Sequence, residues 1–378
     1  MRILLVNAHG ADLAAGGSER YVADLAAGLA SRGHDVHVLS AFPVRKDGAE
    51  STTVLHATHW RDSRARRYRN HLGDLVSIPT RGVRDAIAAA RPDLVHTGNL
   101  PGLATGVWEQ ARRLGLPLVH TLHDYHLLCP RSTLTRRDGS ACCPHPRFCA
   151  LRTRRLARWA PAVSHVIAGS NHLIEREGQL FPNARFEVVR VPFVPVAGRA
   201  LRPPAAPPRS IGYLGGLDVI KGIRELLAAA PELARLGLRV RLAGDGRLRG
   251  DVEAATGPDV EYVGPVLGKQ KVAFIEQADV AICPSTWEEA NGPPYVVAEW
   301  LAAARPVLCS TRGGLAEAAS LPGVVAIEAT AEGIVAGVRR AIEEWGSLSR
   351  LAPVTDSADM ERWLDEHEAV YERASTSV

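Results

Sequence analysis

The sequence has no apolar run that approaches the roughly 20 residues needed to span a membrane. The apolar stretch at its beginning, residues 2–6, is too short for the hydrophobic core of a signal peptide. The Asn7 to Gly10 segment that follows is typical of a turn between a strand and a helix. We therefore expect a cytoplasmic protein. The dinucleotide fingerprint G-x-G-x-x-G is also absent after the first strand, which argues against a cofactor loop of that kind.

Lysine is scarce in this chain, because only four of its 45 basic residues are lysines. They are Lys46, Lys221, Lys269 and Lys271. This bias toward arginine makes each lysine more informative than usual.

Charge is divided unevenly along the chain. Residues 1–190 carry 26 basic and 16 acidic residues, a net charge of +10, whereas residues 191–378 carry 19 and 25, a net charge of −6. The positive half could attract an anionic acceptor, a membrane surface or nucleic acid, or it could be a solvated arginine-rich surface. The most basic run, residues 60–69, fits an acceptor or peripheral membrane contact as well as a solvated helix. No nucleic-acid-binding module accompanies it, so we expect no nucleic-acid partner.

Four of the six cysteines fall within 21 residues, at Cys129, Cys142, Cys143 and Cys149. Their spacing lacks the paired C-x2-4-C knuckles of a standard zinc site, and a cytosolic setting disfavours stable disulfides. Three interpretations therefore stay open: a structural zinc site on an insertion, a redox-labile disulfide, or unpaired thiols in a loop.

The length of 378 residues is more than one typical core accommodates and indicates two domains. We expect the first domain over residues 1–196, joined by a C-terminal helix over 356–378, and the second over 197–355. A proline-rich linker at 198–208 separates them.

The first half opens as a doubly wound α/β sheet. A strand over 2–6, a loop ending in Gly16 and Gly17, a helix that Ser18 would cap, and a strand over 36–39 follow one another. The two glycines allow a ligand to approach the backbone closely, although a plain tight turn explains them as well. A later strand, residues 117–122, ends at His123 and Asp124. Ligands bind at such strand ends in doubly wound sheets.

The second half repeats the α/β pattern. Strands at 209–214, 238–242, 260–264, 279–283 and 307–309 alternate with helices. A loop with Lys221 follows the first of these strands, and an acidic loop over 288–294 follows the fourth. Pro294 then begins a helix whose free N–H groups form a natural anion site, with Glu299 on that helix.

Two motifs resemble a known family. The N-terminal G-G-x-E-R and the P-S-x-W-E-E…N-G-P…E-x-x-A…P-V pattern around residues 284–307 look like the signatures of retaining nucleotide-sugar glycosyltransferases of the group 1 type, the family of bacterial mannosyltransferases and sucrose synthases. The resemblance covers nearly the whole chain. It implies the GT-B fold, in which two doubly wound, Rossmann-like domains face each other across a cleft.

The resemblance also implies roles for single residues. The implied catalytic residues are His123, Glu289 and Asn291. The implied donor-binding residues are Gly16, Gly17, Lys221, Gly244, Val266, Gly292, Tyr295, Val296 and Glu299. The residues themselves, apart from the resemblance, lead us to expect Asp124, at a strand end, and Arg131, in a basic segment, on the acceptor side.

The sequence departs from the family pattern at three places. The family's first glutamate falls eight positions before Glu299, at Asn291 here, so either Glu289 reaches the donor sugar through a longer loop or Asn291 takes its role. Gly216 occupies the position of an arginine that neutralises the donor diphosphate. Pro192 begins a segment that replaces the family's Asn-Gly-Val.

The implied reaction transfers a sugar from a UDP-, dTDP- or GDP-linked donor to an acceptor hydroxyl with retention. The acceptor is a natural product, an oligosaccharide or a lipid-linked intermediate. No D-x-D motif stands at a strand end, and Lys221 with a helix dipole can balance the leaving diphosphate, so we expect no catalytic metal and no cofactor. An isomerase or phosphorylase of the same fold, or a non-catalytic donor-binding relative, is the alternative.

Overall fold

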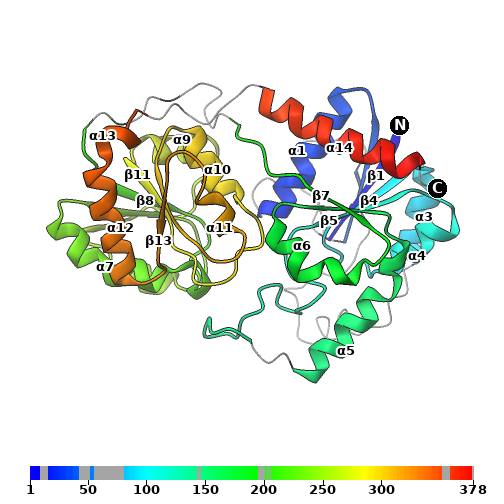
Figure 1. Ribbon diagram of the computed structural model, residues 1–378, viewed down its shortest axis with the longest axis horizontal. Coiled ribbons are helices and arrows are strands. Elements are labelled where there is room, and N and C mark those ends of the chain that lie inside the picture. The colour runs from blue at the N-terminus through cyan, green and yellow to red at the C-terminus, as the bar shows by residue number, and fades with distance from the viewer. Residues whose placement is uncertain are drawn as a thin grey trace. The chain divides into compact units, whose positions relative to one another are not determined.

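A computed structural model describes residues 1–8, 16–41, 52–54, 81–142, 146–194, 201, 204, 206–350 and 358–376, with the backbone alone at 52–54, 81 and 82. The chain divides into two compact units, each built around one parallel sheet (Figure 1). Unit 1 comprises Met1–Leu134, Cys142–Val189 and Arg362–Val378, and unit 2 comprises Thr135–Ala141 and Arg190–Glu361. The basic run at 60–69, Cys143 and most of the linker over 198–208 lie outside the described residues.

Unit 1 holds a sheet of seven parallel strands in the order β3-β2-β1-β4-β5-β6-β7. The strands are β1 (Arg2–Asn7), β2 (Asp35–Ser40), β3 (Thr52–Val54), β4 (Leu94–Thr97), β5 (Leu118–Leu122), β6 (His165–Ala168) and β7 (Arg185–Val188). Five of the six residues of β1 are buried, since helices cover both faces of a parallel sheet.

The helices of unit 1 are α1 (Gly17–Ser31), α3 (Arg81–Ala90), α4 (Gly106–Arg113), α5 (Arg147–Leu156), α6 (Asn171–Glu177) and α14 (Ala358–Thr376), with short 3-10 turns η1 (Ala157–Ala162) and η2 (Gly178–Leu180). The terminal helix α14 packs on α1, where a Cβ on Gly28 would lie 2.6 Å from a methyl group of Leu364. Arg32 forms an ion pair with Glu368 and His34 a hydrogen bond with it, so the end of the chain is fastened to its beginning.

Unit 2 holds a sheet of six parallel strands in the order β10-β9-β8-β11-β12-β13. The strands are β8 (Ser210–Leu214), β9 (Arg239–Ala243), β10 (Val260–Tyr262), β11 (Val280–Cys283), β12 (Val307–Ser310) and β13 (Val324–Ile327). The helices are η3 (Val219–Lys221), α7 (Ile223–Arg235), α8 (Arg249–Ala254), α9 (Gly268–Glu276), α10 (Tyr295–Ala302), α11 (Leu315–Ala318), α12 (Ala331–Glu343) and α13 (Trp345–Leu348). Two apolar clusters form its core, one of them around Trp300 and the other around Leu308.

Both sheets therefore confirm the predicted doubly wound architecture. In each, the strand order reverses direction at one place, between β1 and β4 in unit 1 and between β8 and β11 in unit 2. The loops that leave the carboxyl ends of these strands diverge to opposite faces and leave room for a ligand.

The predicted cap at Ser18 is wrong. Helix α1 begins at Gly17 and its cap position is Gly16, so Ser18 already lies inside the first turn. Its hydroxyl donates to the Glu19 carboxylate at 3.0 Å instead of accepting a backbone N–H. Helix α6 does have a serine cap: Ser170 stands at its cap position, and its Oγ accepts from Leu173 N at 3.1 Å.

Candidate functional site

The Lys221 loop meets the end of β11 at the point where the unit 2 sheet reverses direction. Gly222 has φ 74° between η3 and α7, and a Cβ there would lie 1.9 Å from the carbonyl oxygen of Pro284. Thr286 N donates to Ile220 O at 3.0 Å across the same junction. Only glycine permits this close approach, so the sequence Lys221-Gly222 sets the ammonium group beside the segment after β11.

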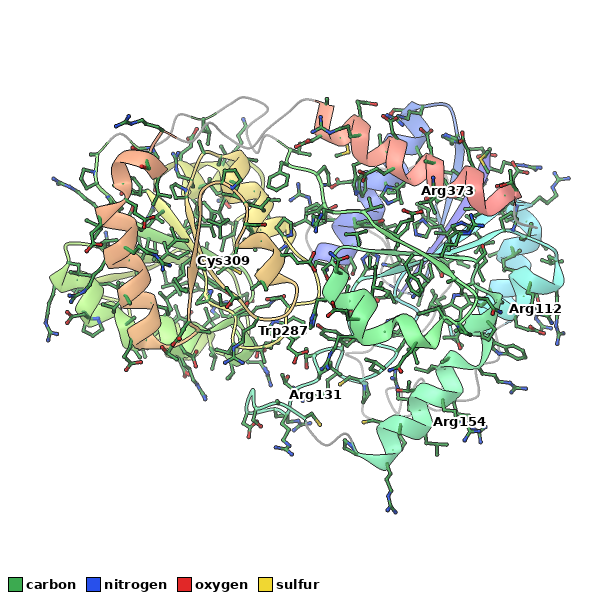
Figure 2. The ribbon with its side chains drawn as sticks, in the orientation of Figure 1. Arg112, Arg131, Arg154, Trp287, Cys309 and Arg373 are labelled. Carbon is green, nitrogen blue, oxygen red and sulfur yellow. The ribbon has the colours of Figure 1, made fainter. Side chains whose placement is uncertain are left out.

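Lys221 forms an ion pair with Glu289 in this junction. The Lys221 Nζ and Glu289 Oε1 atoms are 2.5 Å apart, and the Ser285 hydroxyl donates to the same Oε1 at 2.6 Å. The ammonium also lies 5.1 Å from the centre of the Trp287 ring, a residue labelled in Figure 2. Burial alone would lower the pKa of Lys221, but the Glu289 carboxylate outweighs it and raises that pKa, so the lysine stays charged.

Glu289 rather than Asn291 is therefore the residue that the structure brings to Lys221. Asn291 lies two residues further along a loop that packs on the glycines after β12, where a Cβ on Gly314 would be 2.7 Å from the Asn291 carbonyl carbon. Gly292 precedes Pro293 through a cis peptide bond, and Arg190 Nε donates to the Gly292 carbonyl at 3.0 Å. The catalytic roles assigned to Glu289 and Asn291 stay predictions.

The second predicted glutamate, Glu299, is held by another lysine. It is buried on α10, and its Oε1 pairs with Nζ of Lys271 on α9. Tyr295 and Val296 form the first turn of α10 after Pro294 at the cap position. Sequence reasoning missed Lys271, although the scarcity of lysine was a signal that could have found it: two of the four lysines pair with the two predicted site glutamates.

Glycines also shape the neighbouring loops. A Cβ on Gly244 would lie 1.8 Å from the Gly215 carbonyl oxygen, and one on Gly246 would lie 2.3 Å from that of Leu217. The loops after β8 and β9 thus pack backbone against backbone, with no side chain between them at these glycines. A Cβ on Gly216, in contrast, would meet nothing within 4 Å, so packing does not require glycine at the position where the family carries arginine.

Arg247 is a cation that sequence reasoning missed in these loops. Its guanidinium donates two hydrogen bonds to the Asp218 carboxylate, at 2.7 and 2.6 Å. Asp218 belongs to the turn that carries Lys221, and its charge contributes to raising the pKa of Lys221. Val266 is half-buried against the core, on the loop after β10.

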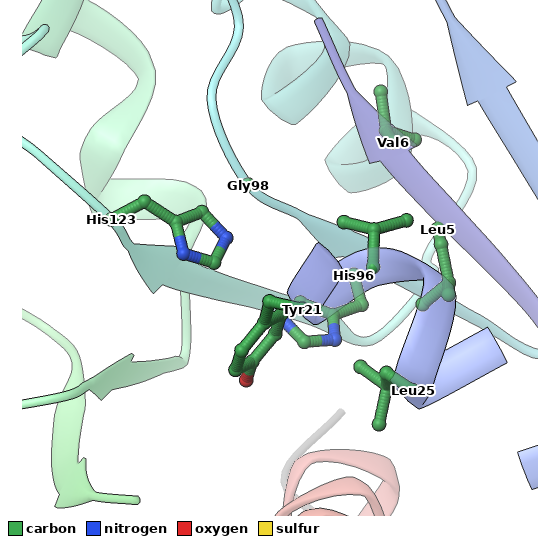
Figure 3. A pocket seen from close by; sticks show the side chains of 8 residues that line it. Leu5, Val6, Tyr21, Leu25, His96, Gly98 and His123 are labelled. Carbon is green, nitrogen blue, oxygen red and sulfur yellow. The ribbon is translucent and has the colours of Figure 1, made fainter. Parts of the chain in front are cut away.

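In unit 1, His123 lines a small cavity beside the β1–β4 reversal (Figure 3). Tyr21, His96 and Gly98 line it as well, and the His123 and Tyr21 rings meet edge to face at 4.8 Å. Burial lowers the pKa of His123 to about 4, against the opposing effect of the Asp124 carboxylate. The imidazole is therefore neutral at neutral pH and can donate one hydrogen bond and accept another.

Asp124 is fixed beside His123 by two donors. Asn99 Nδ2 and His126 N donate to its two carboxylate oxygens, each at 2.8 Å. Burial opposes ionisation, but the interactions with His126 outweigh it and lower the pKa of Asp124. Asp124 is therefore a carboxylate whose orientation is set before any ligand binds.

Two family models match the chain. The model described as Glycosyltransferase Family 4 matches residues 15–192, and the model described as Glycosyl transferases group 1 matches residues 208–344. The chain belongs to the group 1 glycosyltransferases.

Curated relatives and solved structures agree with this assignment. The glycosyltransferase is 26% identical to an uncharacterised 42.6 kDa protein of the cps region of Klebsiella pneumoniae, over 87% of this chain and 90% of that protein. It is also 26% identical to glycogen synthase of Mycobacterium tuberculosis, over 93% and 88% of the two chains.

The fold is GT-B, as predicted. The catalytic domain of starch synthase IV from Arabidopsis thaliana, bound to ADP and acarbose, superposes with a TM-score of 0.68 at 13% identity over 99% of both chains. HepE of Anabaena, in complex with UDP and glucose, superposes with a TM-score of 0.66 at 18% identity over 98% of this chain and 99% of that one.

The remaining predicted residues of the glycosyltransferase are placed as follows. Gly16 and Gly17 form the cap and first residue of α1, and the loop before them is outside the described residues. Arg131 is exposed, and its backbone N–H donates to Cys129 Sγ at 3.4 Å.

The cysteines near Arg131 carry free thiols at Cys129, Cys142 and Cys149, and Cys143 lies outside the described residues. Burial raises the pKa of the Cys149 thiol, and the neighbouring Cys129 and Cys142 reinforce the shift. Within the described part of the chain, no group of three histidine, cysteine or acidic residues is arranged to hold a metal ion. Over the same residues, no helix is both long and apolar enough to cross a bilayer.

Proposed function

We propose that this glycosyltransferase moves a hexose from a nucleoside diphosphate sugar to an acceptor hydroxyl, with retention at the anomeric carbon and without a catalytic metal. The observation that carries the proposal is the Lys221–Glu289 ion pair at the β8–β11 reversal. There the Lys221 ammonium can neutralise the leaving diphosphate. The Glu289 carboxylate and Ser285 hold that ammonium in place before the donor binds. The solved relatives that contain ADP, UDP or UDP-glucose support a nucleoside diphosphate as the ligand.

A second cation would compensate for the arginine missing at position 216. Arg247 lies on the adjoining loop, paired with Asp218. In our proposal its guanidinium turns from Asp218 to a phosphate oxygen when the donor binds, since Arg binds phosphate in the same bidentate manner as carboxylate. The open space beside Gly216 leaves room for the diphosphate at the interlocked glycine loops.

Glu299 is proposed to accept hydrogen bonds from the ribose hydroxyls. Its Oε1 is paired with Lys271, which fixes the orientation of the carboxylate before a diol binds. The neutral imidazole of His123 is proposed to hydrogen-bond the donor sugar.

Retention follows from attack on the face that the leaving group vacates. The acceptor oxygen bonds to the anomeric carbon as its bond to the diphosphate breaks, and the acceptor proton passes to a phosphate oxygen of the departing nucleotide. No pair of facing carboxylates is required, in contrast to glycosidases. The acceptor is proposed to be a natural product, a glycan or a lipid-linked intermediate.

Calorimetric titration with UDP, dTDP and GDP, with and without EDTA, tests the donor site. We expect one nucleotide to bind equally well in both buffers. Lys221→Ala should weaken that binding by about 1–3 kcal/mol, the range for a charge-assisted contact. Lys269→Ala removes an exposed lysine and should leave it unchanged. If no nucleotide binds, or if EDTA abolishes binding, the proposal is wrong.

Turnover with the donor that binds tests the stereochemistry. We expect a product whose anomeric configuration, read by NMR, equals that of the donor. An inverted product would contradict the retaining mechanism while leaving the donor site intact.

A further inference from the structure

Helix α5 exposes two large apolar side chains on one side. Phe148 is 57% exposed and Leu151 54% exposed, and their spacing of three residues places them next to each other on the helix surface. The exposed large apolar residues of the described chain are Met1, Leu114, Phe148, Leu151, Val263 and Leu267. Within that set, Phe148 and Leu151 are the pair that shares a helix. Figure 1 shows α5 at the margin of unit 1.

Arginines surround this apolar pair. Arg147, Arg154 and Arg155 on α5 are exposed, and their spacing of three or four residues from Leu151 puts them on the same side. Arg158, in the 3-10 turn η1 just after α5, is exposed as well. Arg154 is labelled on α5 in Figure 2. The sequence holds no Asp or Glu between Asp138 and Glu175, so the segment that contains α5 has a positive net charge. The outer face of α5 is thus apolar and cationic at once.

The inner face of α5 is fastened to the loop after β5. Buried Arg152 donates through Nη1 to the His126 carbonyl at 2.6 Å, and Thr153 Oγ1 donates to the Leu127 carbonyl at 2.9 Å. Those carbonyls lie two to four residues after His123 and Asp124 in the same loop. Whatever holds α5 therefore also holds the loop that carries these two side chains.

We infer that the outer face of α5 binds the surface of an anionic phospholipid bilayer. Phe148 and Leu151 would enter the interfacial region, and the guanidinium groups would bind lipid phosphates while their aliphatic stems cover apolar surface. Two apolar residues are few, so binding is reversible and depends on the attraction between arginine and anionic lipid. A soluble acidic polymer would satisfy the charges and leave the apolar pair in water, which is why the bilayer fits better.

Docking through α5 has a consequence for the site. It would hold the His123–Asp124 loop close to the membrane, within reach of an acceptor displayed there. Binding to lipid requires neither donor nor turnover, so it can be measured apart from sugar transfer.

Vesicle co-sedimentation of the full chain, without nucleotide, tests the inference. We expect binding to vesicles of phosphatidylcholine mixed with phosphatidylglycerol, little binding to phosphatidylcholine alone, and a decrease as salt rises. Equal recovery with both vesicle types would overturn it.

Paired variants identify the surface. Arg147→Gln with Arg154→Gln should weaken partition about 25-fold, because each arginine near an anionic surface contributes about fivefold. Phe148→Ser with Leu151→Ser should weaken it about tenfold. The matched control, Arg84→Gln with Leu114→Ser, changes an exposed arginine of α3 and an exposed leucine after α4 and should bind as the unchanged chain does.

Circular dichroism melting and nucleotide titration establish that each variant is folded. Folded α5 variants that bind anionic vesicles as well as the unchanged chain would place the contact elsewhere and contradict the inference. A control variant that loses binding equally would do the same, because it would show nonspecific charge attraction. Loss confined to the α5 variants supports it, whether or not the nucleotide binds.

Discussion

Two lysine–glutamate ion pairs in unit 2 explain how buried carboxylates can remain charged at the candidate site. Glu289 and Glu299 are both buried, and each has an ammonium partner that is partly exposed. A buried carboxylate without such a partner would lose much of its hydration with nothing to replace it. Because lysine is scarce in the sequence, the lysines indicated the partners of these glutamates, which the motif spacing alone did not.

Lys271→Ala should destabilise the protein, because it removes the ammonium group that pairs with the buried Glu299 carboxylate. We expect the free energy of unfolding to fall by about 2 kcal/mol, below the cost for a fully buried pair since Lys271 is partly exposed. Urea unfolding of the purified variant measures it.

Two further variants control this prediction. Lys269→Ala lies on the same helix but is exposed, and it should change the stability by less than about 0.5 kcal/mol. Lys271→Ala combined with Glu299→Gln should recover part of the loss, because the stranded charge is gone. No recovery would mean that Lys271 acts through packing rather than through its charge.

The helices and strands show where local sequence determines structure and where it does not. The strands around Leu4 and Ile282 were predictable from apolar runs, because strands buried on both faces are mostly apolar. The short helix α8 was missed, since its six residues carry too little apolar periodicity to be seen. The Ser18 cap failed because Gly16 can serve as the cap without a side chain.

The candidate site was predicted less completely than the fold. Lys221 and Glu299 follow from strand-end loops and motif resemblance, which are local features. Their partners across the fold, and the pairing of Arg247 with Asp218, join residues far apart in the chain. Such contacts depend on how the loops pack against each other, which the apolar periodicity and motif spacing of the sequence do not predict.

The contact between α1 and α14 depends on the absence of a side chain at Gly28. A Cβ there would lie within 2.6 Å of Leu364, which is buried, so Gly28→Val should destabilise unit 1 by about 1–3 kcal/mol through overpacking. Leu364→Ala alone should cost about 2–5 kcal/mol by leaving a cavity.

The double variant distinguishes this contact from a general helix effect. If valine fills the space that Leu364 vacates, the two changes together should cost at least about 1 kcal/mol less than the sum of the single changes in urea unfolding. Strict additivity would show that Gly28 is required for some reason other than its contact with α14.

At the scale of the whole molecule, the two units differ most in their histidine content. All 14 histidines of the sequence fall within the residues of unit 1, and unit 2 has none. Several are buried among one another and among tyrosines, as in the His96, Tyr371 and His367 group. Burial lowers the pKa of His123 and of His367 to about 4, and it also lowers the pKa values of His96 and His120.

Acidification should therefore destabilise unit 1 selectively. A buried histidine whose folded pKa lies below its unfolded value of about 6.5 binds more protons in the unfolded state. The free energy of unfolding is therefore unaffected by this group above pH 6.5 and decreases as the pH falls toward 4. For His123 or His367 the full loss is about 3 kcal/mol each.

Hydrogen exchange measured by mass spectrometry at pH 7, 6 and 5, with rates corrected for intrinsic chemistry, should show protection falling in β1, β4, β5 and α14 while β8, β11 and β12 change little. His367→Gln should reduce the acid-dependent loss in unit 1. Equal losses in both units would mean that carboxylates, which both units contain, set the acid sensitivity in place of the buried histidines.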